Sequence, residues 1–376
     1  MRILYFTRDY TPHDHRFLAA LAKSNHQVFY LRLERAPRQV EDRQVPVEIE
    51  QVVWQGGRRP FQWRSLPGLL VDLRRVLARL QPDLIHAGPI QSAAFMAAMT
   101  GFRPLVSMSW GSDLLRDADS SGWMRWVTRY TLGRTTLLLG DCQAVRQKAG
   151  AVGFPSERVA LFPWGVDLQQ FLPARADDFR QRLGWQDCFV LLSLRSWEPL
   201  YGVDGLVHAF CQAARQIPEL RLLLLGGGSQ AANLRQILLQ NEMLDRVYFC
   251  GQVNQADLPG YYWAADLYLS ASHSDGSSVS LMEALACCKP VLVSDIPGNQ
   301  EWITPGIQGW LFPDGDVNAL AGGIITACDQ RQQLAGMGQA ARSLAEQRAD
   351  WPRNFKILLD AYEMALVINR RFYVVD

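Results

Sequence analysis

The sequence has little of what metal-binding or disulfide-bonded proteins need. Seven cysteines and six histidines are spread over 376 residues, and no CxxC pair or cysteine–histidine ligand spacing occurs among them. This excludes a zinc finger or ribbon, and we expect no metal site. An odd number of cysteines in mostly apolar contexts, such as VYFCG, predicts reduced core thiols of a cytosolic protein.

Long apolar runs are also missing. No stretch reaches the roughly 18 apolar residues that span a bilayer. MRILYF has one Arg and a very short apolar run, so we expect a first strand there and no signal peptide. The chain is nevertheless 48% hydrophobic and has 376 residues, enough for two domains. We therefore expect a cytoplasmic protein of two domains, soluble or peripheral at the inner face of the plasma membrane.

The net charge of +1 hides an uneven distribution. Residues 1–180 hold 24 Lys+Arg against 17 Asp+Glu, whereas the remainder holds 14 against 20. A basic first half favours an anionic surface or acceptor as its partner. No recognised nucleic-acid-binding motif accompanies this charge, so nucleic acid is not an expected partner.

Strand, loop and helix patterns alternate along the chain. Residues 3–32 predict a strand, a polar loop, an amphipathic helix and a second strand, which is a βαβ unit. Segments 82–88 and 104–115 repeat the strand and loop. A continuous apolar strand from Cys188 precedes a helix that begins near Val203, and 351–369 predicts a last amphipathic helix. The pattern is typical of α/β folds with parallel sheets.

The most informative stretch runs from Ser272 to Glu301. LYLSAS (267–272) predicts a buried parallel strand, Asp275 to Ser280 form a loop, and a helix begins near Val279 and closes at Lys289-Pro290. A helix entered from a Gly/Ser loop presents unpaired backbone N–H groups and the positive end of its dipole. Such a terminus favours the binding of a diphosphate.

Two carboxylates accompany this anion site. Asp275 and Glu283 are eight residues apart, so both can line the same cleft. Ionised carboxylates accept hydrogen bonds from sugar and ribose hydroxyls. The alternative is that Asp275 is an N-cap and Glu283 a solvated helix residue.

The stretch resembles the signature of glycosyltransferase family 4, the retaining nucleotide-sugar enzymes of the GT-B fold. Asp275 stands where the family has its first Glu. The matching positions are Glu283, Pro290, Ser294, Gly298 and Glu301. FPWGVDLQQFLP (162–173) also resembles the interdomain stretch of the family.

The resemblance implies an α/β chain of the GT-B class, with two Rossmann-like domains facing across a central cleft. We expect an acceptor domain at 1–167, a linker at 168–187, a donor domain at 188–348, and a C-terminal helix at 349–376 that packs back on the first domain.

For the donor, the resemblance implies a site on the second domain. Arg195 matches an Arg that neutralises the diphosphate, and Tyr201 takes the place of a Lys; a structural ion pair is the alternative role of Arg195. Glu283 would hold the ribose hydroxyls and Asp275 the sugar hydroxyls, and Arg195, Asp275 and Glu283 are the expected catalytic residues. The remaining donor-binding candidates are Gly228 (with Ser229 behind it), Gly251, Val253, Gly276, Ser277, Ser278, Val279 and Ser280.

On the acceptor side, the resemblance points to the loops of the first sheet. Trp110 occupies the place of a His, while Gly111 and Asp113 match the family. Trp110 can stack on a sugar but cannot transfer protons. His86 is the nearest replacement, and His13 and His15 are candidates for contact with the acceptor; a polar loop without a ligand is the alternative for these two.

Arginines and aromatics interleave in two further segments, 56–66 and 123–134. The first precedes a helix with a Leu stripe, which is explained by packing on the sheet. The arginines and aromatics themselves predict peripheral binding to an anionic membrane surface.

We therefore expect a retaining, metal-independent glycosyltransferase without a cofactor. Its substrates would be a nucleotide diphosphate sugar and a glycan or lipid-linked acceptor of cell-envelope or polysaccharide biosynthesis. A nucleotide-sugar epimerase of the same fold, or a catalytically silent nucleotide-sugar binding partner, are the alternatives. The Glu-to-Asp, Lys-to-Tyr and His-to-Trp departures are the reason to keep them.

Overall fold

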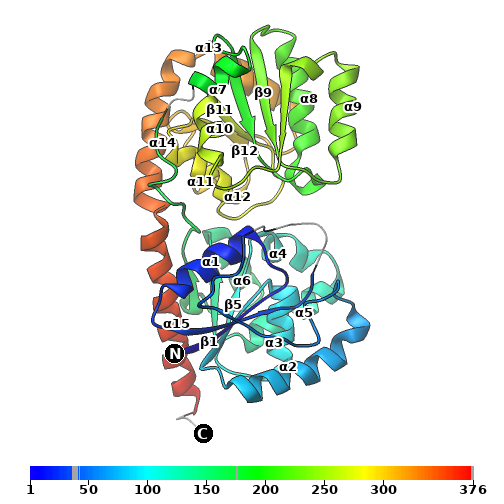
Figure 1. The fold of residues 1–376 in the computed structure, drawn as a ribbon, viewed down its shortest axis with the longest axis vertical. Coiled ribbons are helices and arrows are strands. Elements are labelled where there is room, and N and C mark those ends of the chain that lie inside the picture. Colours follow the sequence, from blue (N-terminus) through cyan, green and yellow to red (C-terminus); the bar gives the residue numbers. More distant parts are fainter. Residues whose placement is uncertain (36–40, 42, 175–176, 374–376) are drawn as a thin grey trace. The chain divides into compact units, whose positions relative to one another are not determined.

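The computed structural model describes residues 1–35, 41, 43–174 and 177–373, and it divides into two compact units (Figure 1). Unit 1 comprises Met1–Phe162 and Phe355–Asp376, and unit 2 comprises Pro163–Asn354. The boundary lies after Phe162, so the segment 168–187 expected as a linker belongs to unit 2. Positions 175 and 176 of that segment, and 374–376 of the expected C-terminal helix, lie outside the described residues.

Unit 1 is built on a parallel sheet. Among its described residues, seven strands follow the order β3-β2-β1-β4-β5-β6-β7. Their bounds are β1 (Arg2–Thr7), β2 (Gln27–Arg32), β3 (Glu50–Gln51), β4 (Leu84–Gly88), β5 (Leu105–Met108), β6 (Leu137–Gly140) and β7 (Val159–Leu161). β1 pairs with both β2 and β4, so the direction of winding reverses there. Sheets of this kind bind ligands beyond the carboxyl ends of the strands at the reversal.

Helices cover both faces of this sheet. They are α1 (Pro12–Ala22), α2 (Leu66–Leu80), α3 (Phe95–Thr100), α4 (Ser112–Leu115), α5 (Gly122–Arg134) and α6 (Gln143–Ala151). α3 contacts α2 on one side and α5 on the other (Figure 1). The Leu stripe of α2, with Leu69, Leu73 and Leu77, is buried against the sheet, which confirms its predicted packing role.

Unit 2 repeats the same plan. Its described strands order as β10-β9-β8-β11-β12-β13, all parallel, with the reversal at β8 and β11. The strands are β8 (Phe189–Ser193), β9 (Leu220–Leu225), β10 (Val247–Gly251), β11 (Leu267–Ser270), β12 (Val291–Ser294) and β13 (Gly309–Phe312). The helices are α7 (Asp177–Arg182), α8 (Val203–Ala214), α9 (Ala231–Gln240), α10 (Leu258–Ala264), α11 (Val279–Ala286), α12 (Pro297–Gln300), α13 (Val317–Asp329) and α14 (Leu334–Arg348).

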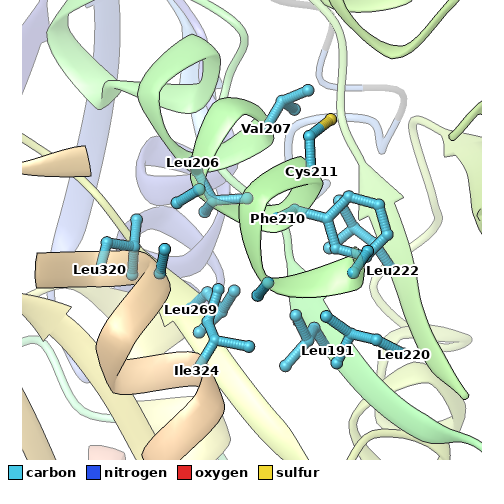
Figure 2. Packing of buried hydrophobic residues seen from close by; sticks show 14 of the residues in the cluster. Leu191, Leu206, Val207, Phe210, Cys211, Leu220, Leu222, Leu269, Leu320 and Ile324 are labelled. Carbon is cyan, nitrogen blue, oxygen red and sulfur yellow. The ribbon is translucent and has the colours of Figure 1, made fainter. Parts of the chain in front are cut away.

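The core of unit 2 lies between its helices and its sheet. Side chains of α8 and α13 pack against the apolar strands β8, β9 and β11 (Figure 2). The labelled residues are Leu191, Leu206, Val207, Phe210, Cys211, Leu220, Leu222, Leu269, Leu320 and Ile324. These parallel strands are mostly apolar, with Arg221 in β9 as the charged exception, because helices cover both of their faces. The loops at the carboxyl ends of these strands therefore start from a well-packed core.

Helix α15 (Trp351–Tyr373) belongs to both units, since unit 1 includes the chain from Phe355 onward. The hydroxyl of Tyr362 lies 2.6 Å from Nδ1 of His86, inside unit 1. Within the described ranges, none of the helices combines the length and the apolar character that crossing a bilayer requires. All seven cysteines are free thiols.

Candidate active site

The candidate donor site lies at the reversal of the unit 2 sheet. Arg195 follows β8 by two residues, and the loop 275–278 connects β11 to α11. Because β8 and β11 are parallel neighbours, both loops leave the same edge of the sheet. The predicted helix start at Val279 is confirmed.

Arg195 ties the two loops together. Its Nη2 donates to Oδ2 of Asp275 at 2.6 Å, and its Nη1 donates to the hydroxyls of Ser278 and Ser280 at 2.7 and 3.2 Å. The Tyr201 ring stacks on the guanidinium, with 4.4 Å from Cζ to the ring centroid. Burial has the largest single effect on the pKa of Arg195 and lowers it, but the charge of Asp275 and the neighbouring tyrosines, Tyr201 first among them, together raise the pKa above its ordinary value. The side chain is therefore a fixed cation.

The N-terminus of α11 carries no side-chain cap. Ser278 is the N-cap residue, but its hydroxyl makes no cap hydrogen bond; it accepts from Arg195 instead. The first N–H groups of the helix consequently lack a side-chain cap, and the dipole end lies beside a guanidinium. Ser277, Ser278 and Ser280 are buried and Val279 half-buried, so this terminus is also shielded from bulk water.

Glu283 is held in one orientation by two side chains. Tyr262 donates to Oε2 at 2.8 Å, and Gln255 donates to Oε1 at 3.1 Å. The Tyr262 hydroxyl also lies 3.0 Å from the carbonyl oxygen of Ser280. Glu283 is 3% exposed, so it is not the solvated helix residue of the alternative reading. A buried, preorganised carboxylate suits the recognition of a diol.

Both carboxylate oxygens of Asp275 accept hydrogen bonds. Besides Arg195 at Oδ2, its Oδ1 accepts from the backbone N–H of Gly276 at 3.1 Å. Gly276 in turn packs on Gly298: a Cβ at Gly298 would lie 2.4 Å from the Gly276 carbonyl oxygen. α12 therefore packs against this loop. Position 298 requires a glycine because a side chain there would clash with the Gly276 carbonyl oxygen.

The triple-glycine loop after β9 has a different role from a plain phosphate loop. A Cβ at Gly228 would lie 2.5 Å from the carbonyl oxygen of Trp197, so the loop packs directly on the segment after Arg195. The Ser229 N–H and hydroxyl donate to Glu198 at 3.0 and 2.5 Å. The donors of Ser229 are therefore already used, and the loop acts first as a support for the Arg195 segment.

Gly251 and Val253 lie at the end of β10. The Gly251 carbonyl oxygen accepts from Gly226 at 2.7 Å, and the residue has φ +67°, with open space where a Cβ would be. Val253 is half-buried. These residues lie at the same sheet edge as Arg195, two strands away along the order β10-β9-β8.

In unit 1, two acceptor-side candidates lie together. The His13 ring, at the start of α1, lies 5.4 Å from the Trp110 ring, which follows β5, and both residues are half-buried. His15 shares a 2.7 Å contact between Nδ1 and the Tyr10 hydroxyl, and burial, followed by the charge of Arg43, lowers its pKa.

His86 and Asp113 serve the interior of unit 1. His86 is 0% exposed, with its Nε2 3.3 Å from Sδ of Met108, and burial lowers its pKa to about 3. This enclosure argues against His86 as the replacement for the missing acceptor-site histidine. Asp113 accepts from the N–H groups of Ile90, Trp110 and Leu114, each at 2.9 Å, and so fixes the loop that carries Trp110.

The sequence interpretation did not select Gln255, Tyr262 or Glu198. Tyr262 belongs to a matching family run, VYFCGQVNQADLPGYYWAAD, which was the available signal. Gln255 and Glu198 carry no signal in a single sequence. In the described part of the chain, no cluster of three or more His, Cys, Asp or Glu residues could hold a metal ion.

Comparisons with known proteins identify the family of the chain. Residues 13–170 match the family described as Glycosyltransferase Family 4, and residues 175–344 match Glycosyl transferases group 1. A D-inositol 3-phosphate glycosyltransferase of Pseudarthrobacter chlorophenolicus is 26% identical over 378 residues, with 93% of this chain and 88% of that protein covered.

A second relative is a GDP-mannose-dependent monoacylated alpha-(1-6)-phosphatidylinositol monomannoside mannosyltransferase of Corynebacterium glutamicum. It is 29% identical over 200 residues, which cover 50% of this chain and about half (52%) of that relative.

Among solved structures, Anabaena HepE in complex with UDP and glucose has a TM-score of 0.80 at 22% identity, covering 97% of this chain and 100% of that chain. This similarity confirms the expected GT-B fold. Together, the two family matches and the shared fold show that the chain belongs to the group 1, family 4 glycosyltransferases.

Proposed function

We propose that the protein transfers a glycosyl unit, with retention, from a nucleoside diphosphate sugar to a lipid-linked or other glycan acceptor in cell-envelope or polysaccharide biosynthesis. The observation that carries the proposal is the junction of Arg195 with the uncapped N-terminus of α11. A fixed cation beside oriented N–H groups is the arrangement that stabilises a departing diphosphate.

The leaving group determines the role of Arg195. As the bond between the anomeric carbon and the β-phosphate oxygen breaks, negative charge develops on that phosphate. Arg195 Nε is buried and has no hydrogen-bond partner within the described part of the chain, so one donor of the guanidinium is available. The guanidinium stabilises this developing charge more strongly than a fully solvated cation would, because its surroundings are preorganised and partly desolvated.

The carboxylates would bind the two sugars of the donor. Glu283, fixed by Tyr262 and Gln255, would accept from the ribose hydroxyls, and Asp275 would accept from the transferred sugar. Tyr201 supplies no charge where the family has Lys, but its ring fixes the plane of Arg195. Backbone groups at 251–253 would contact the base.

The acceptor would bind to unit 1. The neighbouring rings of His13 and Trp110 offer a stacking surface and a titratable nitrogen at one place. The two curated relatives act, by their names, on an inositol phosphate and on a phosphatidylinositol mannoside. A phosphorylated or lipid-linked acceptor at the inner face of the membrane fits the basic first half of this chain.

A thermal-shift screen against uridine, guanosine and adenosine diphosphate sugars identifies the donor, since a ligand that binds the native state raises its Tm. With that donor, Arg195→Ala and Glu283→Ala should each reduce transfer severely, by about 10²-fold or more, without unfolding the chain. Arg331→Ala is the matched control, because Arg331 forms an exposed ion pair with Glu219 in the same unit. Near-normal turnover by either site variant contradicts the assignment.

Product analysis separates the proposal from its alternatives. A new glycosidic bond supports transfer. An isomerised donor without a new bond identifies an epimerase, and donor binding without any turnover identifies a silent binding partner.

A further inference from the structure

Three half-exposed tryptophans of unit 1 form one cluster. Trp63 lies in a 3-10 turn (Trp63–Ser65) before α2, while Trp123 and Trp126 lie on α5. The ring centroids of Trp63 and Trp123 are 5.7 Å apart, and those of Trp123 and Trp126 are 4.9 Å apart, nearly parallel at 21°. Segments about sixty residues apart in sequence thus build a common surface.

These are the most solvent-exposed tryptophans of the protein. Trp63, Trp123 and Trp126 are 41%, 50% and 49% exposed, whereas every other tryptophan in the described residues is buried or only partly exposed. A single exposed apolar residue is ordinary, but a contiguous group marks a surface for interaction.

The cluster is held rigidly from beneath. The buried ring of Phe95, on α3, lies 6.1 Å from Trp63 and 6.0 Å from Trp126. Tyr130 follows Trp126 along α5 at 5.3 Å, and Arg134 covers the Tyr130 ring at 3.7 Å. Since α3 contacts both α2 and α5, the exposed rings are fixed on a packed layer of helices (Figure 1).

Arginines accompany the rings on the same two elements: Arg64 follows Trp63, Arg125 and Arg129 lie on α5, and Arg134 covers Tyr130. Residues 56–80 and 122–134 contain nine arginines and one acid, Asp72. All nine arginines are exposed: Arg58, Arg59, Arg64, Arg74, Arg75, Arg79, Arg125, Arg129 and Arg134. Three of them, Arg58, Arg75 and Arg79, also line a cavity of ≈ 420 Å³ beside Trp54. We call the surface formed by the three tryptophans with Arg64, Arg125, Arg129 and Arg134 the Trp–Arg face; Asp119 lies near Arg125 and Arg129.

We propose that the Trp–Arg face docks the protein on the surface of a bilayer that contains anionic phospholipid. Indole rings reside at the level of the lipid headgroups, and arginines bury their stems while their charges remain among the phosphates. With four arginines against Asp119, the face carries a net positive charge and is complementary to a sheet of phosphates. The docking does not depend on the donor site, which belongs to unit 2.

The test is co-sedimentation of the full chain with vesicles of equal parts phosphatidylcholine and phosphatidylglycerol, without nucleotide sugar. We expect binding that weakens as salt is raised, and much weaker binding to pure phosphatidylcholine. Trp63→Ala/Trp123→Ala/Trp126→Ala should lower the partition coefficient about tenfold or more. Arg64→Ser/Arg125→Ser/Arg129→Ser should lower it about fivefold per arginine and reduce the salt dependence.

The matched control is Leu239→Ala/Tyr248→Ala, which removes exposed apolar side chains from unit 2 and should leave binding unchanged. Circular dichroism checks that each variant is folded. Quenching of tryptophan fluorescence by brominated lipid, in the unaltered chain, gives a readout that needs no substitution.

The proposal is overturned if the unaltered chain stays in the supernatant at low salt, or if the folded tryptophan variant binds vesicles as well as the unaltered chain does. Because no donor is present, either result leaves the proposed glycosyl transfer untouched. If the unaltered chain binds vesicles but transfers no sugar to a water-soluble acceptor, only the proposed function is contradicted.

Discussion

Replacing Arg195 tests whether its ion pair with Asp275 serves catalysis or only the fold. Arg195→Ala removes three hydrogen bonds, of 2.6, 2.7 and 3.2 Å, and leaves Asp275 unpaired with its side chain 19% exposed. An unpaired, largely buried carboxylate costs about 1 to 3 kcal/mol. For a unit of this size, that lowers Tm by roughly 2 to 10 °C.

The catalytic effect should be larger and separable. Loss of a preorganised group that stabilises developing charge lowers kcat by a factor of about 10² to 10³, or about 2.7 to 4 kcal/mol. Arg195→Lys keeps the charge but cannot reach Asp275 and the Ser278 hydroxyl together. We expect it to retain part of the activity, because a point charge replaces a planar fork.

The double variant Arg195→Ala/Asp275→Ala separates the two roles. Removing the unpaired carboxylate should restore most of the Tm, while kcat/KM with the identified donor stays as low as in Arg195→Ala. Steady-state kinetics and thermal unfolding on the same samples give both quantities. Recovery of kcat/KM to near the unaltered value would refute the catalytic role and leave a structural ion pair.

Three further substitutions test the supports of the two units. Tyr262→Phe removes the hydroxyl bound to Glu283 and should raise the donor KM about tenfold, with a smaller effect on kcat. Gly228→Ala should lower Tm, by an overpacking cost of about 1 to 3 kcal/mol, because the new Cβ would meet the Trp197 carbonyl oxygen at 2.5 Å. Burial raises the pKa of Asp14 to about 7. The folded state therefore keeps a proton that the unfolded chain releases above about pH 4, so stability falls as pH rises from about 4 to 7. Asp14→Asn should flatten that part of the profile of Tm against pH.

Each of these substitutions has a control. Tyr248→Phe alters a tyrosine that is 41% exposed and should leave KM unchanged; an equal rise in both variants would argue against the role of Tyr262. Gly227→Ala has nothing within 4 Å of its new Cβ and should be neutral, so equal losses at 227 and 228 would contradict the close approach. If Asp14→Asn and the unaltered chain show parallel profiles of Tm against pH, the raised pKa of Asp14 is refuted.

The sequence was sufficient for the fold because its signals are local. The apolar strand after Cys188, the helix starts at Val203 and Val279 and the Gly/Ser loop before α11 follow from composition and spacing alone. The Leu stripe of α2 likewise predicted its buried side. Helical and strand periodicity report which side of an element is buried, and two parallel sheets follow from their alternation.

The site could be predicted only in part because its contacts join distant residues. Asp275 looked like an N-cap by spacing, yet Ser278 is the N-cap and Asp275 pairs with Arg195, eighty residues earlier. His86 was expected near the end of its strand but lies in the middle of β4, where its ring contacts Tyr362 in the core; a strand buried on both faces has no alternation that would reveal this. The Trp63 and Trp123 contact had no signal in either segment alone.

Helix α15 affects the order in which the two units can fold during synthesis. Unit 1 begins at the first residue but is completed only by residues from Phe355 onward, and Tyr362 covers His86 in its interior. On the ribosome, the whole of unit 2 is synthesised before that tyrosine exists. Domains otherwise fold in the order of their synthesis. Here unit 2 can reach its final state first, while the interior of unit 1 lacks its cover over His86 until the residues from Phe355 onward have been made.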